Sequence, residues 1–216
     1  MADRDVLEAI EKNVSACDTG KISELLPAVK DEAAADDILK SLNKGIEAAR
    51  KLFKEGTYAL PDFLLAIDAY RLGTHYLRNN IKEIDDSDNP RVVIGVVEGD
   101  VHDMGKNIVA AVLEASGFSV TDLGNNVSND NFLEALKSVE PEILALSTMM
   151  STTLENMEAL IRQVKSFFPK TLILIGGAPF DPDLARDMGA DGYAENVITI
   201  PDESQRILLA ARPESS

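Results

Sequence analysis

Cysteine is nearly absent from this chain of 216 residues, which contains only Cys17. A single cysteine excludes an internal disulfide framework and any zinc site built from several cysteines. Long apolar runs are also missing, since none approaches the ~20 residues that a membrane-spanning helix requires. The first residues, MADRDVLEAI, lack the basic and then apolar segments of a secretory signal peptide, so we expect a cytoplasmic protein.

Basic residues are scarce, because 21 lysines and arginines stand against 37 acidic residues, a formal net charge of −16. Nucleic-acid-binding proteins usually carry a basic stripe that displaces counterions from phosphates, and none is visible here. We therefore expect neither a nucleic-acid partner nor a membrane partner. The acidity favours solubility and by itself indicates no activity.

The pattern of apolar residues up to residue 84 predicts one helix after another. Apolar residues recur at three- and four-residue spacing in VLEAIEKNV, ISELLPAVK and ILKSLNKGIEAARKLF. A fourth segment, LPDFLLAIDAYRLGTHYL, is apolar on nearly all sides and must be covered on more than one of them. We predict a four-helix bundle over residues 1–84, followed by an exposed acidic linker at residues 85–90.

The rhythm of the sequence changes after this linker. Short runs rich in β-branched residues alternate with helical segments; the runs are RVVIGVVE, FSVTDLG, EILALS and TLILIGG. A short fifth strand is expected at DGYA and a last helix at VITIPDESQRILLAA. The alternation predicts an α/β domain over residues 91–216, with a flavodoxin-like (Rossmann-type) five-stranded parallel sheet covered by helices on both faces.

One of the chain's two histidines, His102, lies in GDVHDMGKNI, directly after the first predicted strand. Ligands bind at the carboxyl ends of the strands in such a sheet, so this position makes His102 a candidate site residue. A phosphate loop would need GxxxxGK followed by serine or threonine. Here five residues separate Gly99 from Gly105, and Asn107 follows the lysine, which disfavours a phosphate site.

Two interpretations of His102 remain open. It could be a loop residue that caps the helix beginning near Gly105. It could instead be a metal ligand, because Asp100 is near enough to hold the other ring nitrogen and fix the tautomer. No second histidine or cysteine stands nearby to complete a zinc site. The protein would then supply one axial ligand to a metal whose other positions are filled, as in a macrocycle.

Several motifs resemble those of a known family. DVHDMGK is similar to the DxHxxG signature of cobalamin-binding domains. LALSTMM resembles the family's SxL element, with Ser147 in place and Met149 instead of leucine, and LILIGGAP resembles its GG element, with Gly176 and Gly177. FKEGTYALPDFLLAIDA is similar to the helical cap that precedes this domain in methionine synthase and in the corrinoid proteins of methyltransferase systems. The resemblance covers nearly the whole chain.

The resemblance implies a bound cobalamin or related corrinoid, base-off, with His102 as the axial ligand of cobalt and the nucleotide tail in a channel beside the sheet. Glycines would leave room for that tail, although a GG pair at a strand end is also typical of an ordinary tight turn. The residues that the resemblance assigns to corrinoid binding are Gly99, Asp100, Val101, His102, Asp103, Gly105, Ser147, Met149, Ser151, Gly176, Gly177 and Val197.

The resemblance also implies a hydrogen-bonded relay from His102 through Asp100 to Thr153, in which threonine replaces the family's serine. Thr153 could alternatively cap the helix that follows it. Apolar side chains of the cap would cover the methyl face of the corrin, and by position they are Phe53, Leu60 and Phe63. Their spacing is equally typical of a bundle core.

The function implied by the resemblance is that of a non-catalytic methyl carrier. Its corrinoid would pass a methyl group from a substrate-specific methyltransferase to a second methyltransferase acting on a thiol or a tetrahydropterin, with a reductive activase as a further partner. The linker would serve as the hinge that uncovers cobalt. The alternatives are a cobalamin-dependent sensor, which would normally carry a DNA-binding module, a cobalamin-binding subunit of a mutase, and an apo structural domain.

Overall fold

The computed structural model describes residues 4–28, 32–81 and 89–211. The chain divides into two compact units, Met1–Asp88 and Asn89–Ser216. Most of the predicted linker and hinge falls in residues 82–88, which lie outside the described residues. In the described parts of the chain, every helix is too short or too polar to cross a membrane.

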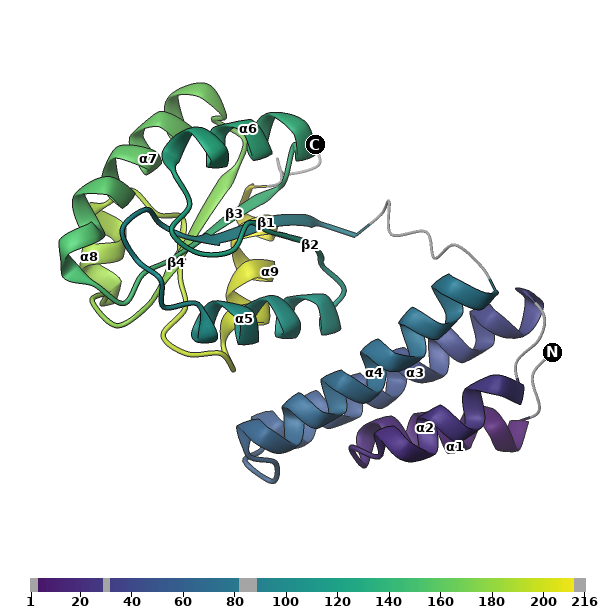
Figure 1. The fold of residues 1–216 in the computed structure, drawn as a ribbon. Coiled ribbons are helices and arrows are strands. Elements are labelled where there is room, and N and C mark those ends of the chain that lie inside the picture. The colour runs from purple at the N-terminus through teal and green to yellow at the C-terminus, as the bar shows by residue number, and fades with distance from the viewer. Residues whose placement is uncertain (1–3, 29–31, 82–88, 212–216) are drawn as a thin grey trace. The chain divides into compact units, whose positions relative to one another are not determined.

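The N-terminal unit is made of helices that pack along one another (Figure 1). They are α1 (Arg4–Ser15), α2 (Thr19–Leu25), the short 3-10 helix η1 (Leu26–Ala28), α3 (Glu32–Lys54) and α4 (Leu60–Asn80). Proline in the first turn of α4 and the Asp62 carboxylate, which accepts the Ala59 N–H at 2.9 Å, explain where that helix begins. The predicted helical bundle is confirmed.

The predicted cap phenylalanines lie inside this bundle. The rings of Phe53 and Phe63 stack with centroids 4.8 Å apart, and both side chains are buried. Leu60, at the start of α4, is only half-buried. Close packing of the helices is seen at Gly73 of α4, where a Cβ atom would lie 2.5 Å from Cδ2 of Leu42 in α3. The two phenylalanines are therefore part of the bundle core.

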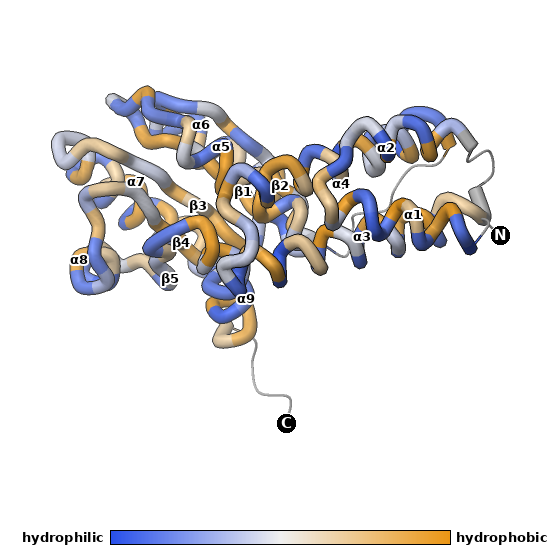
Figure 2. The backbone as a smooth tube through the Cα atoms, turned by 90° about the horizontal axis from the view of Figure 1, so that it is seen from below, coloured by the Kyte–Doolittle hydropathy of each residue, from blue (hydrophilic) through white to orange (hydrophobic). Residues whose placement is uncertain are grey.

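The C-terminal unit contains a five-stranded parallel sheet with the strand order β2-β1-β3-β4-β5. The strands are β1 (Arg91–Val96), β2 (Ser119–Asp122), β3 (Ile143–Ser147), β4 (Leu172–Gly176) and β5 (Gly192–Tyr193). This order is the flavodoxin-like one, so the predicted fold class is confirmed. Strands β1, β3 and β4 are hydrophobic along most of their length (Figure 2), as expected for a sheet covered on both faces. The edge strand β2, with the sequence SVTD, is only partly buried.

Helices cover both faces of the sheet (Figure 1). One face carries α5 (Met104–Ala115) and α9 (Ile200–Ala211); the other carries α6 (Asn129–Val139), α7 (Leu154–Phe167) and α8 (Pro182–Asp187), with the 3-10 helix η2 (Ser151–Thr153) before α7. Helix α9 begins three residues later than the sequence predicts, because the Asn196 side chain accepts the N–H groups of Ile198 and Thr199. Val197 therefore lies in a turn. The carboxyl ends of the strands meet at one edge, which carries the loops after β1, β2, β3 and β4.

Candidate functional site

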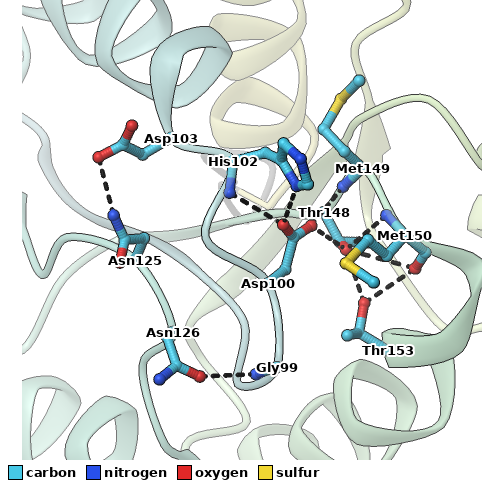
Figure 3. Close-up of polar contacts among 10 residues, drawn as sticks. All are labelled: Gly99, Asp100, His102, Asp103, Asn125, Asn126, Thr148, Met149, Met150 and Thr153. Carbon is cyan, nitrogen blue, oxygen red and sulfur yellow. Dashed lines mark hydrogen bonds and ion pairs between the residues drawn. The ribbon is translucent and has the colours of Figure 1, made fainter.

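The centre of this edge is the carboxylate of Asp100, which is completely buried. Its Oδ1 accepts the backbone N–H of His102 at 2.9 Å and lies 2.6 Å from His102 Nδ1. Its Oδ2 accepts the N–H of Met149 at 2.6 Å and the hydroxyl of Thr148 at 2.7 Å (Figure 3). The loops after β1 and β3 are thus joined through one carboxylate.

These hydrogen bonds determine the charge of the carboxylate. Burial alone would raise the pKa of Asp100, but the N–H groups of His102 and Met149, the Thr148 hydroxyl and the His102 ring outweigh it and hold this pKa well below its usual range. An ionised carboxylate can only accept hydrogen bonds, so His102 Nδ1 must carry the ring proton. In the neutral imidazole the lone pair of His102 Nε2 is therefore available to a ligand.

The imidazole of His102 faces outward. Its side chain is 60% exposed, whereas that of its partner Asp100 is 0% exposed. Three apolar side chains nearby in the sequence or on the facing loop are also exposed: Val101 at 64%, Met104 at the start of α5 at 77%, and Met149 at 52%. Apolar side chains that gather in solvent commonly mark a surface that a ligand covers. Met104 was not among the residues predicted from the sequence.

Thr153 lies one hydroxyl further from Asp100 than the sequence suggests. Its Oγ1 is 2.6 Å from Oγ1 of Thr148, and it is Thr148 that contacts the carboxylate. Although Thr153 stands at the N-cap position of α7, its side chain makes no capping hydrogen bond. The N-cap of α5 is Asp103, so His102 does not have the capping role that was its alternative interpretation.

The loop after β2 braces the loop that carries His102. Asn126 Oδ1 accepts the N–H of Gly99 at 2.7 Å, and the Asn126 N–H donates to the Asp100 carbonyl at 2.9 Å. Asn125 Nδ2 donates to the Asp103 carboxylate at 2.9 Å. The pair Asn125 and Asn126 was missed by the sequence analysis, because nothing in a single sequence shows that this loop lies beside that of His102.

An ion pair between the buried Lys106 and the exposed Asp122 anchors the start of α5. Lys106 is 2% exposed, and its Nζ lies 2.6 Å from Oδ1 of Asp122 at the end of β2. A cation in the first turn of a helix opposes the helix dipole, so the carboxylate is needed to stabilise it. The contact holds the helix that follows the His102 loop against the sheet.

The glycines of the site differ in what their missing side chains permit. A Cβ at Gly177 would lie 1.7 Å from the Thr148 carbonyl oxygen, so the chain's own backbone requires glycine there. A Cβ at Gly176 would meet nothing closer than the Ala194 carbonyl oxygen at 3.6 Å, and one at Gly105 would meet nothing within 4 Å. Gly176 and Gly105 therefore leave space that the protein does not fill.

The remaining predicted residues lie at various distances from this centre. Ser147 ends β3 and pairs in register with Gly176, so these two members of the SxL and GG elements are neighbours. Ser151 is exposed at the start of η2, and Val197 is half-buried in the turn before α9. Phe53, Leu60 and Phe63 belong to the N-terminal unit.

The donor set fits a corrinoid better than a metal ion held by protein ligands alone. Within the described residues, no group of three or more histidine, cysteine, aspartate or glutamate side chains could hold a metal ion. One oriented imidazole nitrogen is available, flanked by exposed apolar side chains and by the unfilled space at Gly105 and Gly176. A macrocycle that brings its own equatorial ligands needs such an arrangement.

Comparison with known proteins agrees with this geometry. The B12 binding domain family matches residues 90–200. Dimethylamine corrinoid protein 3 of Methanosarcina acetivorans is 32% identical over 213 residues, which cover 97% of this chain and 100% of that protein. Trimethylamine corrinoid protein 1 of the same organism is 33% identical over 196 residues, covering 86% of this chain and 91% of that one.

Two solved structures are similar over nearly the whole chain. A cobalamin-binding protein from Desulfitobacterium hafniense superposes with a TM-score of 0.69 at 30% identity and covers 93% of this chain and 98% of that one. The methanol:cobalamin methyltransferase complex MtaBC from Methanosarcina barkeri superposes with a TM-score of 0.83 at 26% identity, covering 96% of this chain and 81% of that one. The chain therefore belongs to the B12-binding family, among the corrinoid proteins of methyltransferase systems.

Proposed function

We propose that the protein carries a methyl group on a base-off corrinoid whose lower axial ligand is Nε2 of His102. The observation that carries this proposal is an exposed imidazole whose Nδ1 is held at 2.6 Å by a buried carboxylate. When bound, the corrinoid supplies a cobalt centre that accepts a methyl group and releases it again. The relatives named for dimethylamine, trimethylamine and methanol systems support this assignment.

The chain's own residues have binding and orienting roles in this proposal. Asp100 keeps the proton on His102 Nδ1 and stabilises the imidazole as a ligand. Val101, Met104 and Met149 would lie against the corrin and keep water away from the axial bond, because all three are exposed and apolar. The remaining residues assigned to corrinoid binding are Gly99, Asp103, Gly105, Ser147, Ser151, Gly176, Gly177 and Val197.

The N-terminal unit would cover the methyl face of the corrin. Of its three proposed cap residues, Phe53 and Phe63 are buried against each other, so replacing either would also weaken the bundle. Leu60 is half-buried and is therefore the residue to test first. A Leu60→Ala variant is expected to bind the corrinoid normally and to lose the methyl group faster under illumination, which the visible absorbance would follow.

The partners in this proposal are a substrate-specific methyltransferase and a second methyltransferase that delivers the methyl group to a thiol or a tetrahydropterin. A reductive activase would rescue oxidised cobalt. The methyl donor is chosen by the first partner, and the relatives point to a small methylated amine or alcohol. The superposition with MtaBC supports a methyltransferase partner.

Axial ligation can be tested with the chain's two histidines as a matched pair. Protein labelled with ¹⁵N-histidine is loaded with cob(II)alamin. The hyperfine coupling between the unpaired electron on cobalt and a histidine nitrogen is then measured by electron paramagnetic resonance. We expect His102→Ala to lose this coupling and His75→Ala, in an exposed position on α4, to retain it. Coupling that survives in His102→Ala would overturn the proposed ligation.

Carrier activity is tested separately from binding. Protein loaded with methylcobalamin is mixed in the dark with a thiol-dependent and, in parallel, a tetrahydropterin-dependent acceptor methyltransferase. A carrier should transfer its methyl group to one acceptor, at a rate that depends on the added enzyme. No transfer to either acceptor in the dark would contradict the carrier role.

A further inference from the structure

Thr148 is a fully buried threonine that the sequence motifs pass over, since it stands between Ser147 and Met149 of the SxL element. Its Oγ1 lies 2.7 Å from Asp100 Oδ2 and 2.6 Å from Thr153 Oγ1. The N–H of Met150 also donates to this oxygen, at 3.1 Å. Figure 3 shows the Thr148 hydroxyl between the carboxylate and Thr153.

The direction of these hydrogen bonds follows from counting protons. Thr148 has one hydroxyl proton. The Asp100 carboxylate accepts N–H groups and has no proton to donate, so it can only accept a hydrogen bond from Thr148. The Thr148 proton therefore points to Asp100. Two hydroxyl oxygens 2.6 Å apart need a proton between them, and with the Thr148 proton on Asp100 it comes from Thr153, whose Oγ1 also lies 2.9 Å from the Met150 carbonyl oxygen, a second acceptor. The chain of donors runs from Thr153 to Thr148 to Asp100.

We propose that Thr148 is the positioning residue that orients Asp100, and through it the ring of His102, whereas Thr153 acts only by way of Thr148. With Oδ2 held by the Thr148 hydroxyl and the Met149 N–H, the carboxylate cannot rotate, and Oδ1 stays on Nδ1 of His102. The ring is thereby kept in the tautomer that presents Nε2 outward. The functional meaning of this tautomer rests on the proposed ligation of cobalt by His102.

A purely structural role for Thr148 makes different predictions. By accepting the Met150 N–H, its hydroxyl also stabilises the turn after β3. Thr148→Val keeps the shape of the side chain and removes the hydroxyl, while Thr148→Ser keeps the hydroxyl. The tautomer of His102 separates the two roles of Thr148. Loss of its contact with Asp100 would change the tautomer, whereas a weaker turn after β3 alone would not.

The first experiment uses the full-length protein without cofactor, labelled with ¹⁵N-histidine. Long-range ¹H–¹⁵N spectra at mildly alkaline pH report the tautomer of each imidazole, and the exposed His75 on α4 is an internal reference. We expect His102 to be mainly Nδ1-protonated in the wild type, to shift several-fold towards the Nε2-protonated form in Thr148→Val, and to recover in Thr148→Ser. A folded Thr148→Val protein with the wild-type His102 spectrum would overturn the proposal.

The second experiment measures cobalamin affinity by titration of the visible absorbance. Loss of a partner behind a metal ligand commonly weakens metal binding roughly 10- to 100-fold, which we expect for Thr148→Val. Thr153→Val should have a smaller effect, because Thr148 keeps its contact with Asp100. Equal or greater weakening by Thr153→Val would contradict the order of the chain.

The two proposals fail in different ways. If His102→Ala loses the nitrogen coupling to cobalt while Thr148→Val matches the wild type in both experiments, ligation stands and the role of Thr148 is refuted. If His102→Ala binds cobalamin with unchanged coupling, ligation is refuted, and the tautomer spectra of the cofactor-free protein still decide whether Thr148 orients the ring.

Discussion

The two faces of the sheet are built from side chains of different size. The face covered by α6, α7 and α8 is filled with large apolar residues, including Phe132, Leu136, Met157, Leu160, Ile161 and Val164. The face covered by α5 and α9 has small residues where the strands end, since Ser147, Gly176 and Ala194 follow the buried positions Ala145 and Leu174 on the same side. The first face stabilises the domain, and the second leaves room beside the candidate site.

The largest effect is expected from a substitution that disrupts the contact between the loops after β3 and β4. Gly177→Ala should destabilise the protein by about 5 kcal/mol or prevent folding, because its Cβ would overlap the Thr148 carbonyl and its φ is +130°. Gly176→Ala is the matched control and should cost less than about 1 kcal/mol while weakening corrinoid binding. Urea unfolding and cobalamin titration measure the two effects. Equal destabilisation by both changes would refute this distinction.

The packed face can be broken with Phe132→Ala. Phe132 is buried, and its ring atoms would lie 2.7 Å from a Cβ at Gly95, so it fills the space that this glycine leaves. Removing the ring should lower the free energy of unfolding by roughly 3–5 kcal/mol. Cobalamin affinity of the folded fraction should be unchanged. A large loss of affinity would show that this face also shapes the binding site.

Acid should reveal the contribution of Asp100, which sits where the loops of both faces meet. Its pKa is lowered by folding, so its stabilisation is complete above the unfolded pKa of about 3.9 and is lost as pH falls below it. The difference in unfolding free energy between wild type and Asp100→Asn should shrink as pH falls below about 4. Urea unfolding at each pH measures it; a gap that widens in acid would contradict this sign.

The smallest effect is expected on the face with small residues. Ser204 of α9 is 0% exposed, and its hydroxyl has no hydrogen-bond partner among the described residues. Ser204→Ala replaces this unsatisfied hydroxyl by a hydrogen atom, so it should change the free energy of unfolding by less than about 0.5 kcal/mol or increase it. Thermal unfolding is sufficient to check this. A loss of roughly 2 kcal/mol, as expected for a broken buried hydrogen bond, would show that the Ser204 hydroxyl has a partner.

Most of the fold could be predicted because the elements carry local periodicity. The strand runs and the bundle helices follow directly from the spacing of their apolar residues. The start of α9 could not be placed, because Val197, Ile198 and Thr199 continue the apolar pattern while the Asn196 side chain holds them in a turn. A side chain that hydrogen-bonds to the backbone and so delays a helix does not change the spacing of apolar residues.

Some contacts of the site could be predicted from the sequence and others could not. The contact between His102 and Asp100 follows from a separation of two residues within one turn. Thr148 had an available signal, because strand alternation turns it to the opposite side from Ser147, towards α7 and Thr153. The family motif pointed to Thr153 instead, because a motif compares positions in the sequence and not the directions of side chains.

By itself the sequence determined the division into a helical and an α/β unit, the parallel sheet and the corrinoid-binding motifs, because each depends on neighbours along the chain. Only the tertiary structure decided which hydroxyl reaches Asp100, which asparagines brace its loop and which glycine the backbone requires. Those contacts join the loops after β1, β2, β3 and β4, and these loops become neighbours only when parallel strands bring their carboxyl ends to one edge.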